Sequence, residues 1–361
     1  MGLLYKLERK TLEVVRAYKA KRIRQDLWDY KIKIRKDNMS GKVQLSDEQK
    51  KQIHDFWDRY IKIDDTLHTY YLEKTGKFYP DLMPDPIYYC YVNPYFDDVA
   101  KAQTYENKCL YNQLYPNSRQ ARIVASRVNK IWRDSNYQPI SFECVKKKAS
   151  ESGCVVVKQA QKTWGGFGVA FAEGDTLVED LEKYANTISE DMIIQEPLSQ
   201  HKDISKIGSK SINSIRMISV LYPEEVKVYA PVMRIGVGDS RTDNTSSGGI
   251  SCGIDETGRL MPVAYNDNGE CFHEHPTSHV KFDEIVVPNF EKVEEFVRNA
   301  HGATPYFRMI SWDIAVEADG LPTLIEANLQ SGGLDLHQYN HGPAFGEDTE
   351  RILNEVFGKK R

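Results

Sequence analysis

The sequence predicts an α+β protein with a basic, helical N-terminal extension, and three observations carry this prediction. Apolar residues recur every three to four positions through the first 60 residues, which is the period of amphipathic helices. Short apolar stretches dominate between residues 153 and 326, which is typical of strands. Residues 311 to 333, SWDIAVEADGLPTLIEANLQSGG, alternate apolar and polar side chains on both sides of a turn, which predicts a β-hairpin.

Size and charge limit the kinds of protein this chain can be. Its 361 residues exceed a single core of ordinary size, so two or three lobes are expected. The net charge of −4 argues against a nucleic-acid-coating protein, and no nucleic-acid partner is predicted. Residues 1 to 36 are an exception, because twelve basic and four acidic side chains give this segment a net charge of +8.

The cysteines and the apolar runs predict where the protein works. Six cysteines lack paired metal-type spacing and are expected to be reduced thiols, which favours a cytoplasmic location. No apolar run approaches the roughly 20 residues of a membrane span, and the start MGLLYKLERK lacks the apolar core of a signal peptide.

The N-terminal region is expected to be helical. One amphipathic helix runs from residue 4 to 34 and is broken by DNMSG at residues 37 to 41. A second helix begins at Ser46, where SDEQ has the pattern of a capping box, and its apolar face extends to Tyr60. The Pro- and Tyr-rich stretch over residues 78 to 96 is predicted to be a loop or boundary, because proline cannot continue a helix.

Strands follow from Gly153 onward. Residues 155–158 and 167–171 are predicted strands joined by a glycine-rich segment, and residues 176–188 form a helix. Residues 192–197 form a strand that ends at a proline. Residues 214–222 and 226–236 are then expected to pair as a hairpin.

The last predicted hairpin has a defined register. Asp319 and Gly320 predict a two-residue primed turn. Both central residues of such a turn must accept a positive φ, and Asp-Gly is a favoured pair for this reason. That turn places Asp313 directly opposite Glu326, with Cβ atoms about 5 Å apart. Asn328 lies diagonally beside them on the same face.

Two opposed carboxylates repel, so something must offset the repulsion. A bound divalent cation would do so, and two carboxylates with an amide oxygen form the hard ligand set that suits Mg²⁺. The alternative is a solvated hairpin face, on which Asp313, Glu326 and Asn328 are ordinary polar residues.

A lysine followed by glycines is a second candidate site, for binding phosphate. Lys158 ends an apolar strand and is followed by Gly165, Gly166 and Gly168, whose backbone amides could close over phosphates. The alternative is a structural glycine-rich hairpin, since the segment lacks the Lys-Ser/Thr tail of a Walker loop.

Arg216 and Arg234 lie within otherwise apolar strands. An inward-facing arginine needs an anionic partner, and a structural ion pair is the alternative to a ligand. The following segment DNTSSGG, residues 243 to 249, is a backbone-rich turn suited to an anion.

The order of these parts resembles an ATP-grasp fold, in which two α+β lobes hold the nucleotide. The elements are a strand-ending lysine with a glycine loop, QEP, SINSIRMISV, RIG with DN and GG, and finally WDIAV and LIEANLQSG. The chain is most similar to the sugar-transfer associated branch, whose members accompany glycosyltransferases in bacterial surface-polysaccharide gene sets. YENKCLYNQLYP, residues 105 to 116, is similar to the start of the grasp region, and the resemblance covers roughly residues 80 to 355.

The resemblance implies a role for each matching residue. Lys158 contacts the phosphates of ATP, and the glycine loop at residues 165–168 is the flexible lid. The family has two lysines that contact the phosphates, and in this chain either Arg122 or Arg127 takes the place of the first one. The site residues implied for the remaining parts are Gln195, Glu196 and Leu198 at the adenine-reading hinge, Asp203 at the ribose, and Asp313, Glu326 and Asn328 as Mg²⁺ ligands.

The resemblance also implies a division of the chain and an activity. The segments are residues 1–75 (basic helical), 76–150 (N-terminal lobe), 151–200 (small lobe with the lid) and 201–361 (large lobe with the metal site). The implied activity is an ATP-dependent carboxylate–amine ligase that forms an acyl phosphate, which Arg216 and Arg234 stabilise, in surface-polysaccharide or capsule biosynthesis. A phosphotransferase and a nucleotide-binding docking protein of a glycosyltransferase complex are the alternatives.

The basic N-terminal helix has two interpretations. Its charge and apolar stripe are typical of an interfacial helix, which would place the enzyme at the inner membrane surface or beside a membrane-bound glycosyltransferase. In the alternative, the stripe packs against the folded lobes.

Overall fold

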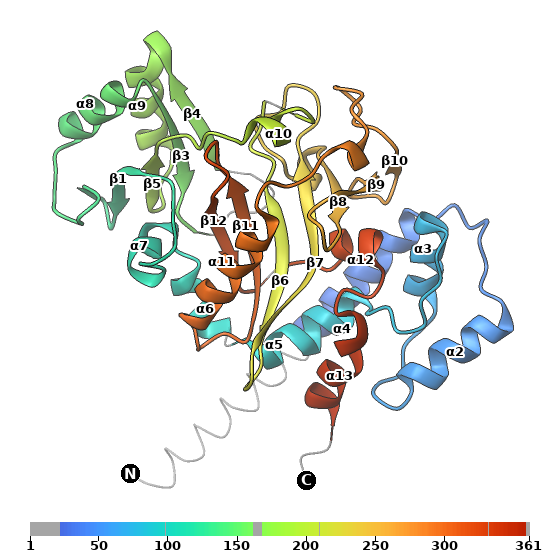
Figure 1. Ribbon diagram of the computed structural model, residues 1–361. Helices are drawn as coiled ribbons and strands as arrows, with labels where there is room; N and C mark the ends of the chain where they lie inside the picture. The colour runs from blue at the N-terminus through green and yellow to red at the C-terminus, as the bar shows by residue number, and fades with distance from the viewer. Residues whose placement is uncertain (1–21, 98, 162–167, 209, 331, 359–361) are drawn as a thin grey trace, which may run out of the picture. The chain divides into compact units, whose positions relative to one another are not determined.

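The computed structural model of the protein describes residues 22–97, 99–161, 168–208, 210–330 and 332–358 (Figure 1). The chain forms two compact units, Met1–Tyr95 with Gly346–Arg361, and Phe96–Phe345. The second unit contains both β-sheets.

The first unit is built from helices. The predicted N-terminal helix is confirmed over residues 22–37, and its first part lies outside the described residues. The capping box is also confirmed, since the Ser46 hydroxyl accepts a hydrogen bond from the Gln49 N–H and the Gln49 side chain accepts one from the Ser46 N–H. The helices of this unit are α2 (Asp47–Trp57), α3 (Thr66–Thr75), α4 (Asp85–Ile87), the π-helical turn η1 (Tyr88–Val92), α5 (Asn93–Phe96), which ends at the edge of the second unit, η6 (Gly346–Asp348) and α13 (Thr349–Phe357).

Residues 78–96 were predicted to be a loop or a boundary. The loop is wrong from Asp85 onward, because α4, η1 and α5 follow one another without a break, whereas the division between the two units does fall in this stretch, after Tyr95. Pro86 lies in the first turn of α4, where its missing N–H has no helical partner to lose. Pro94 follows the π-helical turn, whose last bond runs from the Asn93 N–H to the Tyr88 carbonyl. The widened turn thus accommodates a proline that a regular α-helix would not.

A buried ion pair anchors the C-terminal half of the helix over residues 22–37 within its unit. The Arg35 guanidinium donates to Asp85 at 2.8 and 3.1 Å and lies over the Tyr70 ring. Both charged side chains are almost fully buried. In contrast, Ile23 and Tyr30 on the same helix are 66% and 58% exposed.

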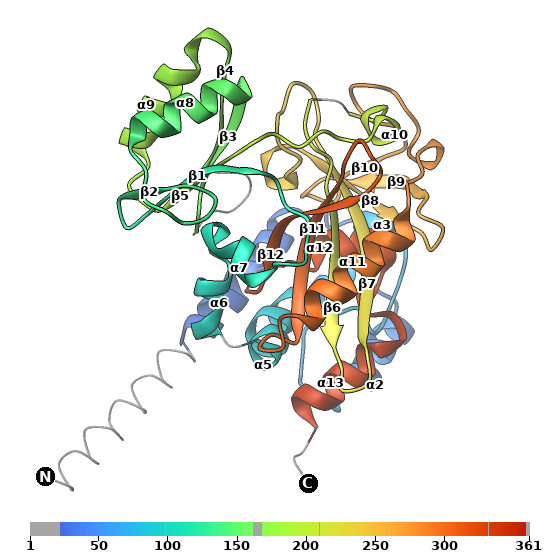
Figure 2. The ribbon, with the colours of Figure 1, turned by 60° about the vertical axis from the view of Figure 1, so that its left-hand side comes forward.

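The smaller sheet of the second unit has five antiparallel strands in the order β2-β1-β5-β3-β4. Helices α8 and α9 pack together over one face of it (Figure 2) and bury an aliphatic cluster that includes Val145, Val157 and Leu181. The elements are β1 (Ile123–Val128), β2 (Ile131–Arg133), α8 (Phe142–Ser152), β3 (Cys154–Gln159), β4 (Val169–Glu173), η3 (Gly174–Thr176), α9 (Leu177–Thr187) and β5 (Met192–Gln195). The predicted strands and helix from Gly153 to residue 197 are confirmed.

The larger sheet has seven antiparallel strands in the order β10-β9-β8-β7-β6-β11-β12. Its strands are β6 (Ile215–Leu221), β7 (Val226–Ile235), β8 (Ile250–Ile254), β9 (Leu260–Tyr265), β10 (Cys271–Phe272), β11 (Met309–Val316) and β12 (Pro322–Asn328). The predicted β6–β7 hairpin is confirmed, with Leu221 opposite Val226. The remaining helices of the unit are α6 (Val99–Tyr105), η2 (Lys108–Leu110), α7 (Tyr111–Leu114), α10 (Lys202–Ser205), η4 (Thr245–Ser247), η5 (Phe282–Glu284), α11 (Phe290–Gly302) and α12 (Asp335–His341).

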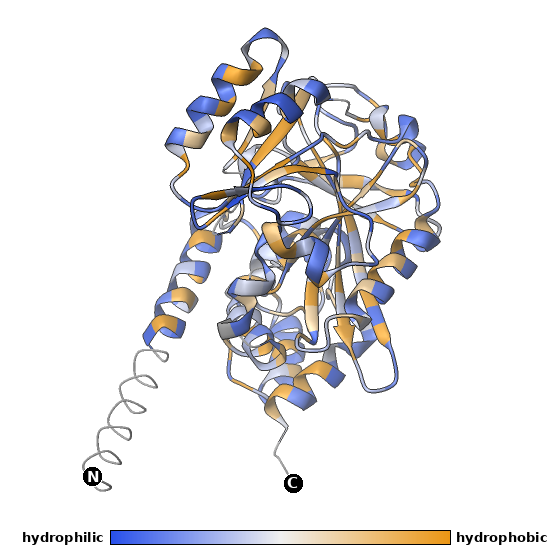
Figure 3. Cartoon of the chain, turned by 90° about the vertical axis from the view of Figure 1, so that its left-hand side faces the viewer, coloured by the Kyte–Doolittle hydropathy of each residue, from blue (hydrophilic) through white to orange (hydrophobic). Residues whose placement is uncertain are grey.

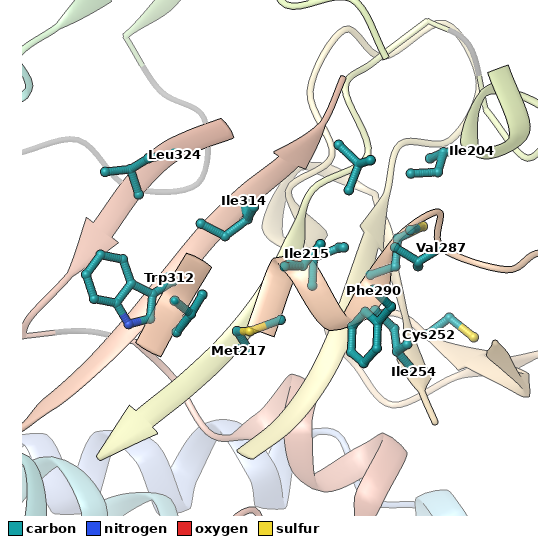
Figure 4. Close-up of a cluster of buried hydrophobic side chains, with 14 of the residues drawn as sticks. Ile204, Ile215, Met217, Cys252, Ile254, Val287, Phe290, Trp312, Ile314 and Leu324 are labelled. Atoms are coloured by element: carbon teal, nitrogen blue, oxygen red, sulfur yellow. The ribbon is translucent and has the colours of Figure 1, made fainter. Parts of the chain in front are cut away.

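The core of this sheet lies where α11 packs on β6, β7 and β11. Met217, Trp312 and Phe290 are buried there, as Figure 4 shows. The Trp312 indole N–H donates to the Ser219 hydroxyl at 2.7 Å, so the one polar atom of this ring is satisfied inside the core.

The β11–β12 hairpin keeps the predicted register by a different route. Asp313 is opposite Glu326, as predicted, but Val316 is opposite Pro322, one residue out of that register. Glu317 and Leu321 are still paired, so the loop consists of the three residues 318–320. A hydrogen bond from the Gly320 N–H to the Glu317 carbonyl closes the loop, and only Gly320 among the three has a positive φ. A bulge between Asp313 and Ile314 then restores the predicted pairing of the carboxylates.

The strands of both sheets show hydrophobic colour along their lengths in Figure 3, whereas the helices alternate between the two kinds of residue. Among the described residues, no helix is both long enough and apolar enough to span a membrane. All six cysteines are free, as expected for reduced thiols.

Candidate active site

A pocket of about 470 Å³ lies in the second unit and is bordered by strands of both sheets. Strands β3 and β4 and the segment after β5 supply one side, and β6, β7, β11 and β12 supply the other (Figure 2). Ten charged residues line it, namely Lys108, Lys158, Lys210, Arg216, Arg234, Arg241, Glu196, Asp243, Asp313 and Glu326. The excess of cations favours an anionic ligand.

Asp313 is the centre of the charge network on the larger sheet. Arg216, its neighbour on β6, donates to both carboxylate oxygens at 2.7 Å, and Arg234 on β7 lies 3.2 Å away. Burial alone would raise the pKa of Asp313, but Arg216 and Arg234 outweigh burial and hold that pKa below its ordinary value. Burial likewise opposes the charge of Arg216, yet Asp313 raises the pKa of Arg216 above its usual range. The aspartate is therefore ionised in the folded protein.

Arg234 extends this network to a second aspartate. Its guanidinium lies 3.4 Å from Asp243 and donates to Ser214 and Asn244 at 2.8 to 3.1 Å. Asp243 in turn accepts hydrogen bonds from the N–H and hydroxyl of Ser214. Both predicted inward-facing arginines thus have anionic protein partners, and their planar groups are fixed by several bonds each.

Glu326 is neutralised by a different cation. The Lys108 ammonium lies 2.5 Å from its carboxylate. Asn328 donates from Nδ2 to the Ser311 carbonyl at 3.2 Å, and its Oδ1 accepts no hydrogen bond from a described residue. The repulsion expected between Asp313 and Glu326 is therefore offset by side-chain cations in this structure, so the opposed carboxylates do not by themselves require a metal ion.

Lys158 is the cation of the smaller sheet that faces the pocket. It is partly exposed, and its ammonium forms no hydrogen bond or ion pair with any residue that the structure describes. Burial lowers the pKa of Lys158 to about 8, and the charge of Lys108 adds to this effect. An ammonium beside a second lysine, with no ion-pair partner among the described residues, is suited to bind a polyanion.

Three charged residues of the pocket were not predicted from the sequence, namely Lys210, Arg241 and Lys108. Of these, Lys108 contacts Glu326. It lies in η2, within the segment YENKCLYNQLYP, whose resemblance to the start of the grasp region was the available signal. The two arginines expected to take this place lie elsewhere. Arg122 is 72% exposed and pairs with Glu196, whereas Arg127 donates to the carbonyls of Ala185, Ile188 and Glu190, and neither lines the pocket.

The segment after β5 borders the pocket as the hinge interpretation requires. Gln195 ends β5 between β1 and β3, and its side chain does not reach the pocket. Glu196 and Leu198 do line it. The Glu196 N–H is bonded to the Arg122 carbonyl, while the Leu198 N–H has no partner among the described residues.

Two other predicted positions contribute less to this pocket. Asp203, in α10, pairs with Lys206 at 2.6 Å and does not line it. Gly168 adopts a φ of 80° directly before β4, a conformation that favours glycine. Gly165 and Gly166 lie outside the described residues.

One contact joins the sheets at the mouth of the pocket. Arg241, from the segment after β7, forms two bonds with Glu173 on β4 at 2.7 and 3.2 Å. Its guanidinium also lies 3.6 Å from the ring centre of Phe171. The contact is exposed, so its stabilising effect is small.

This order of elements, with a charged pocket between two antiparallel sheets, is that of an ATP-grasp protein. The sequence profile of the sugar-transfer associated ATP-grasp family matches residues 99–352, and the chain belongs to that family. The predicted family and fold class are thereby confirmed.

Solved structures of other ATP-grasp proteins are similar at low identity. D-alanyl-alanine synthetase A from Vibrio cholerae is 12% identical with a TM-score of 0.41, over 72% of this chain and 65% of that one. The VanG D-Ala:D-Ser ligase from Enterococcus faecalis is 10% identical with a TM-score of 0.43, over 74% and 62%. The chain thus spans slightly less than two thirds of these proteins. No curated protein sequence matches it.

Proposed function

We propose that this protein is an ATP-dependent carboxylate–amine ligase, which joins a sugar acid to an amino acid or amine in surface-polysaccharide biosynthesis. The observation that carries the proposal is the convergence of Lys108, Lys158, Arg216 and Arg234 on one pocket beside the Asp313–Glu326 pair. Membership of the sugar-transfer associated ATP-grasp family supports the substrate class.

The cations would divide the work of nucleotide binding and acyl transfer. Lys158 and Lys108 would bind the phosphates, and the Leu198 N–H and Glu196 carbonyl would read the adenine edge. Arg216 and Arg234 would stabilise the charge on the substrate carboxylate and on the acyl phosphate. Since protein groups already fix both guanidinium planes, little reorganisation is needed when this charge develops.

The carboxyl side chains fit a magnesium ion. Asp313 is ionised, Glu326 faces it directly, and the Asn328 Oδ1 lacks a described donor, which together make a hard oxygen set. Asp313, Glu326 and Asn328 would hold the ion, with Lys108 turning from Glu326 toward phosphate. When bound, Mg²⁺ would withdraw charge from the phosphates of ATP.

The chemistry balances without a side-chain nucleophile. A substrate carboxylate oxygen attacks the γ-phosphorus of ATP, the bond to ADP breaks, and an acyl phosphate forms. The amine nitrogen then attacks the acyl carbon, phosphate leaves with the bond-pair electrons, and the amine proton passes to phosphate or water. Arg216 and Arg234 would hold the oxyanion of that second step.

An ADP-release assay over uronic acids crossed with amino acids and amines tests the proposal. We expect release that requires one member of each class. Release that needs the first substrate but no amine would favour a phosphotransferase instead, and nucleotide binding without any release would favour a docking protein.

We also propose that the basic N-terminal helix holds the enzyme at an anionic membrane surface or a membrane-bound glycosyltransferase. The exposure of Ile23 and Tyr30 supports this proposal, because apolar side chains in solvent beside basic ones suit an interface. Vesicle co-sedimentation of the full chain and a variant lacking residues 1–30, which keeps the buried Arg35–Asp85 pair, tests it. Salt-sensitive pelleting of the full chain alone is expected, and equal, negligible pelleting of both would reject it.

A further inference from the structure

A second cavity of about 360 Å³ adjoins the active-site pocket in the same unit. Its walls come from the segment after β7, the start of β8 and the loop between β9 and β10. Thr245 and Ser246 line both cavities. The two cavities are therefore neighbours that share these two residues.

The two cavities differ in charge. Six lysines and arginines line the active-site pocket. Among the described residues that line the second cavity there is no lysine or arginine, and Asp267 is the one acid. A carboxylate or phosphate group therefore suits the first cavity, where cations can pair with it, and a neutral part of a ligand suits the second.

The second cavity presents hydroxyl and amide groups beside an aromatic ring. Thr245 and Ser246 supply hydroxyls, Asn268 supplies an amide and Phe272 supplies the ring, whereas the Asn266 amide is engaged within its own loop. Neutral groups that both donate and accept hydrogen bonds match a ligand with several hydroxyls, whose C–H face can lie on an aromatic side chain. A volume of this size is within the range of small-molecule sites.

The loop that forms one wall is held in place by its own hydrogen bonds. The Asn266 Oδ1 accepts from the N–H groups of Asn268 and Glu270 at 3.0 Å, and its Nδ2 donates to the Glu270 carboxylate at 2.6 Å. The wall is thus formed before any ligand binds, which reduces the entropy lost on binding.

We propose that the second cavity binds a neutral, polyhydroxylated glycosyl part of the substrate. The reacting carboxylate or amine of that substrate then extends past Thr245 and Ser246 into the active-site pocket. The proposal rests on the proposed ligase function and names the substrate class of the same site.

Saturation-transfer NMR of the full chain with methyl glucoside, methyl galactoside and the methyl glycoside of N-acetylglucosamine tests this proposal. Alanine and ethanolamine serve as probes without a sugar ring. We expect signals from at least one glycoside, weakened roughly tenfold in affinity by Phe272→Ala, which removes the ring. Pro276→Trp, at an exposed position that lines only the second cavity, should have the same effect by filling it.

Ser150→Trp on α8 is the matched control, because Ser150 is equally exposed and lines neither cavity. It should leave glycoside binding unchanged. Mg-ATP binding by calorimetry is measured on the same samples and should stay within about twofold in all three variants. Glycoside signals that survive both cavity variants, or signals from the amines alone, would overturn the glycosyl site. If the unaltered chain does not bind Mg-ATP, the ligase proposal is overturned instead.

Discussion

The two sheets that border the pocket present their charges in different ways. The larger sheet has a buried network of two arginines and two aspartates that neutralise one another, namely Arg216, Arg234, Asp313 and Asp243. On the smaller sheet, Lys158 faces the pocket with no described partner. The larger sheet is therefore organised before a ligand arrives, whereas the smaller sheet holds an ammonium that has no ion-pair partner among the described residues and that a bound anion could pair.

The largest effect should follow from breaking the organised side. Asp313→Asn leaves Arg216 buried without its carboxylate partner, so the free energy of unfolding should fall by about 3–5 kcal/mol. ADP release should be lost as well, because the proposed metal ligand is gone. Urea denaturation and ADP release measure the two effects.

Glu326→Gln is the control that separates fold from function. Its partner Lys108 contacts it at the partly exposed edge of the network, so the stability loss should be about 1 kcal/mol or less. ADP release should still fall by orders of magnitude. Full turnover in both variants would contradict the magnesium assignment.

Removing the unpaired charge should affect binding alone. Lys158→Ala eliminates a partly desolvated ammonium without breaking an ion pair with a described residue, so thermal stability should stay the same or rise. The Kd for Mg-ATP should rise about tenfold or more, because a charged hydrogen bond to phosphate contributes about 1.5–3 kcal/mol. Calorimetry that finds equal Kd values in variant and parent would exclude the phosphate role.

The same lysine predicts a pH dependence. With its pKa lowered to about 8, Lys158 loses its proton as the pH rises above 8, and only the protonated form attracts phosphate. The Kd for Mg-ATP should therefore rise above pH 8, by at most about tenfold per pH unit. Lys158→Arg should remove this dependence, because arginine stays charged. A flat profile in the parent protein would argue that another cation dominates.

The smallest effect distinguishes the alternatives for the first phosphate cation. Arg122→Ala breaks an exposed ion pair with Glu196, so the thermal stability should change little, and nucleotide affinity should stay the same. Lys108→Ala should instead weaken Mg-ATP binding. If a nucleotide titration finds that Arg122→Ala weakens Mg-ATP binding more than Lys108→Ala does, Arg122 is the phosphate-binding residue.

Sequence patterns with a local cause were recovered well. The Ser46 capping box, the β6–β7 hairpin and the opposition of Asp313 and Glu326 all depend on residues close in the chain. The predicted two-residue turn of the β11–β12 hairpin was wrong, but a bulge in the hairpin restores the predicted pairing of Asp313 with Glu326.

What failed depended on contacts between distant residues. Lys108 reaches Glu326 across 218 positions, and periodicity carries no information about such a pair. Arg127 is committed to carbonyls at the end of α9, which a list of cations in the sequence cannot reveal. The division into four segments and the roles of the site residues stay predictions.

If the protein is a ligase as proposed, this pocket forms an acyl phosphate from ATP and a carboxylate. The most direct measurement uses the acid and amine that give the highest ADP release, with the carboxylate oxygens labelled with ¹⁸O. Because the carboxylate oxygen attacks the γ-phosphorus and stays with it when the amine displaces phosphate, we predict one ¹⁸O atom in each phosphate released. Formation of ADP with unlabelled phosphate would contradict an acyl phosphate intermediate. Failure of every pair of acid and amine to release ADP would contradict it as well.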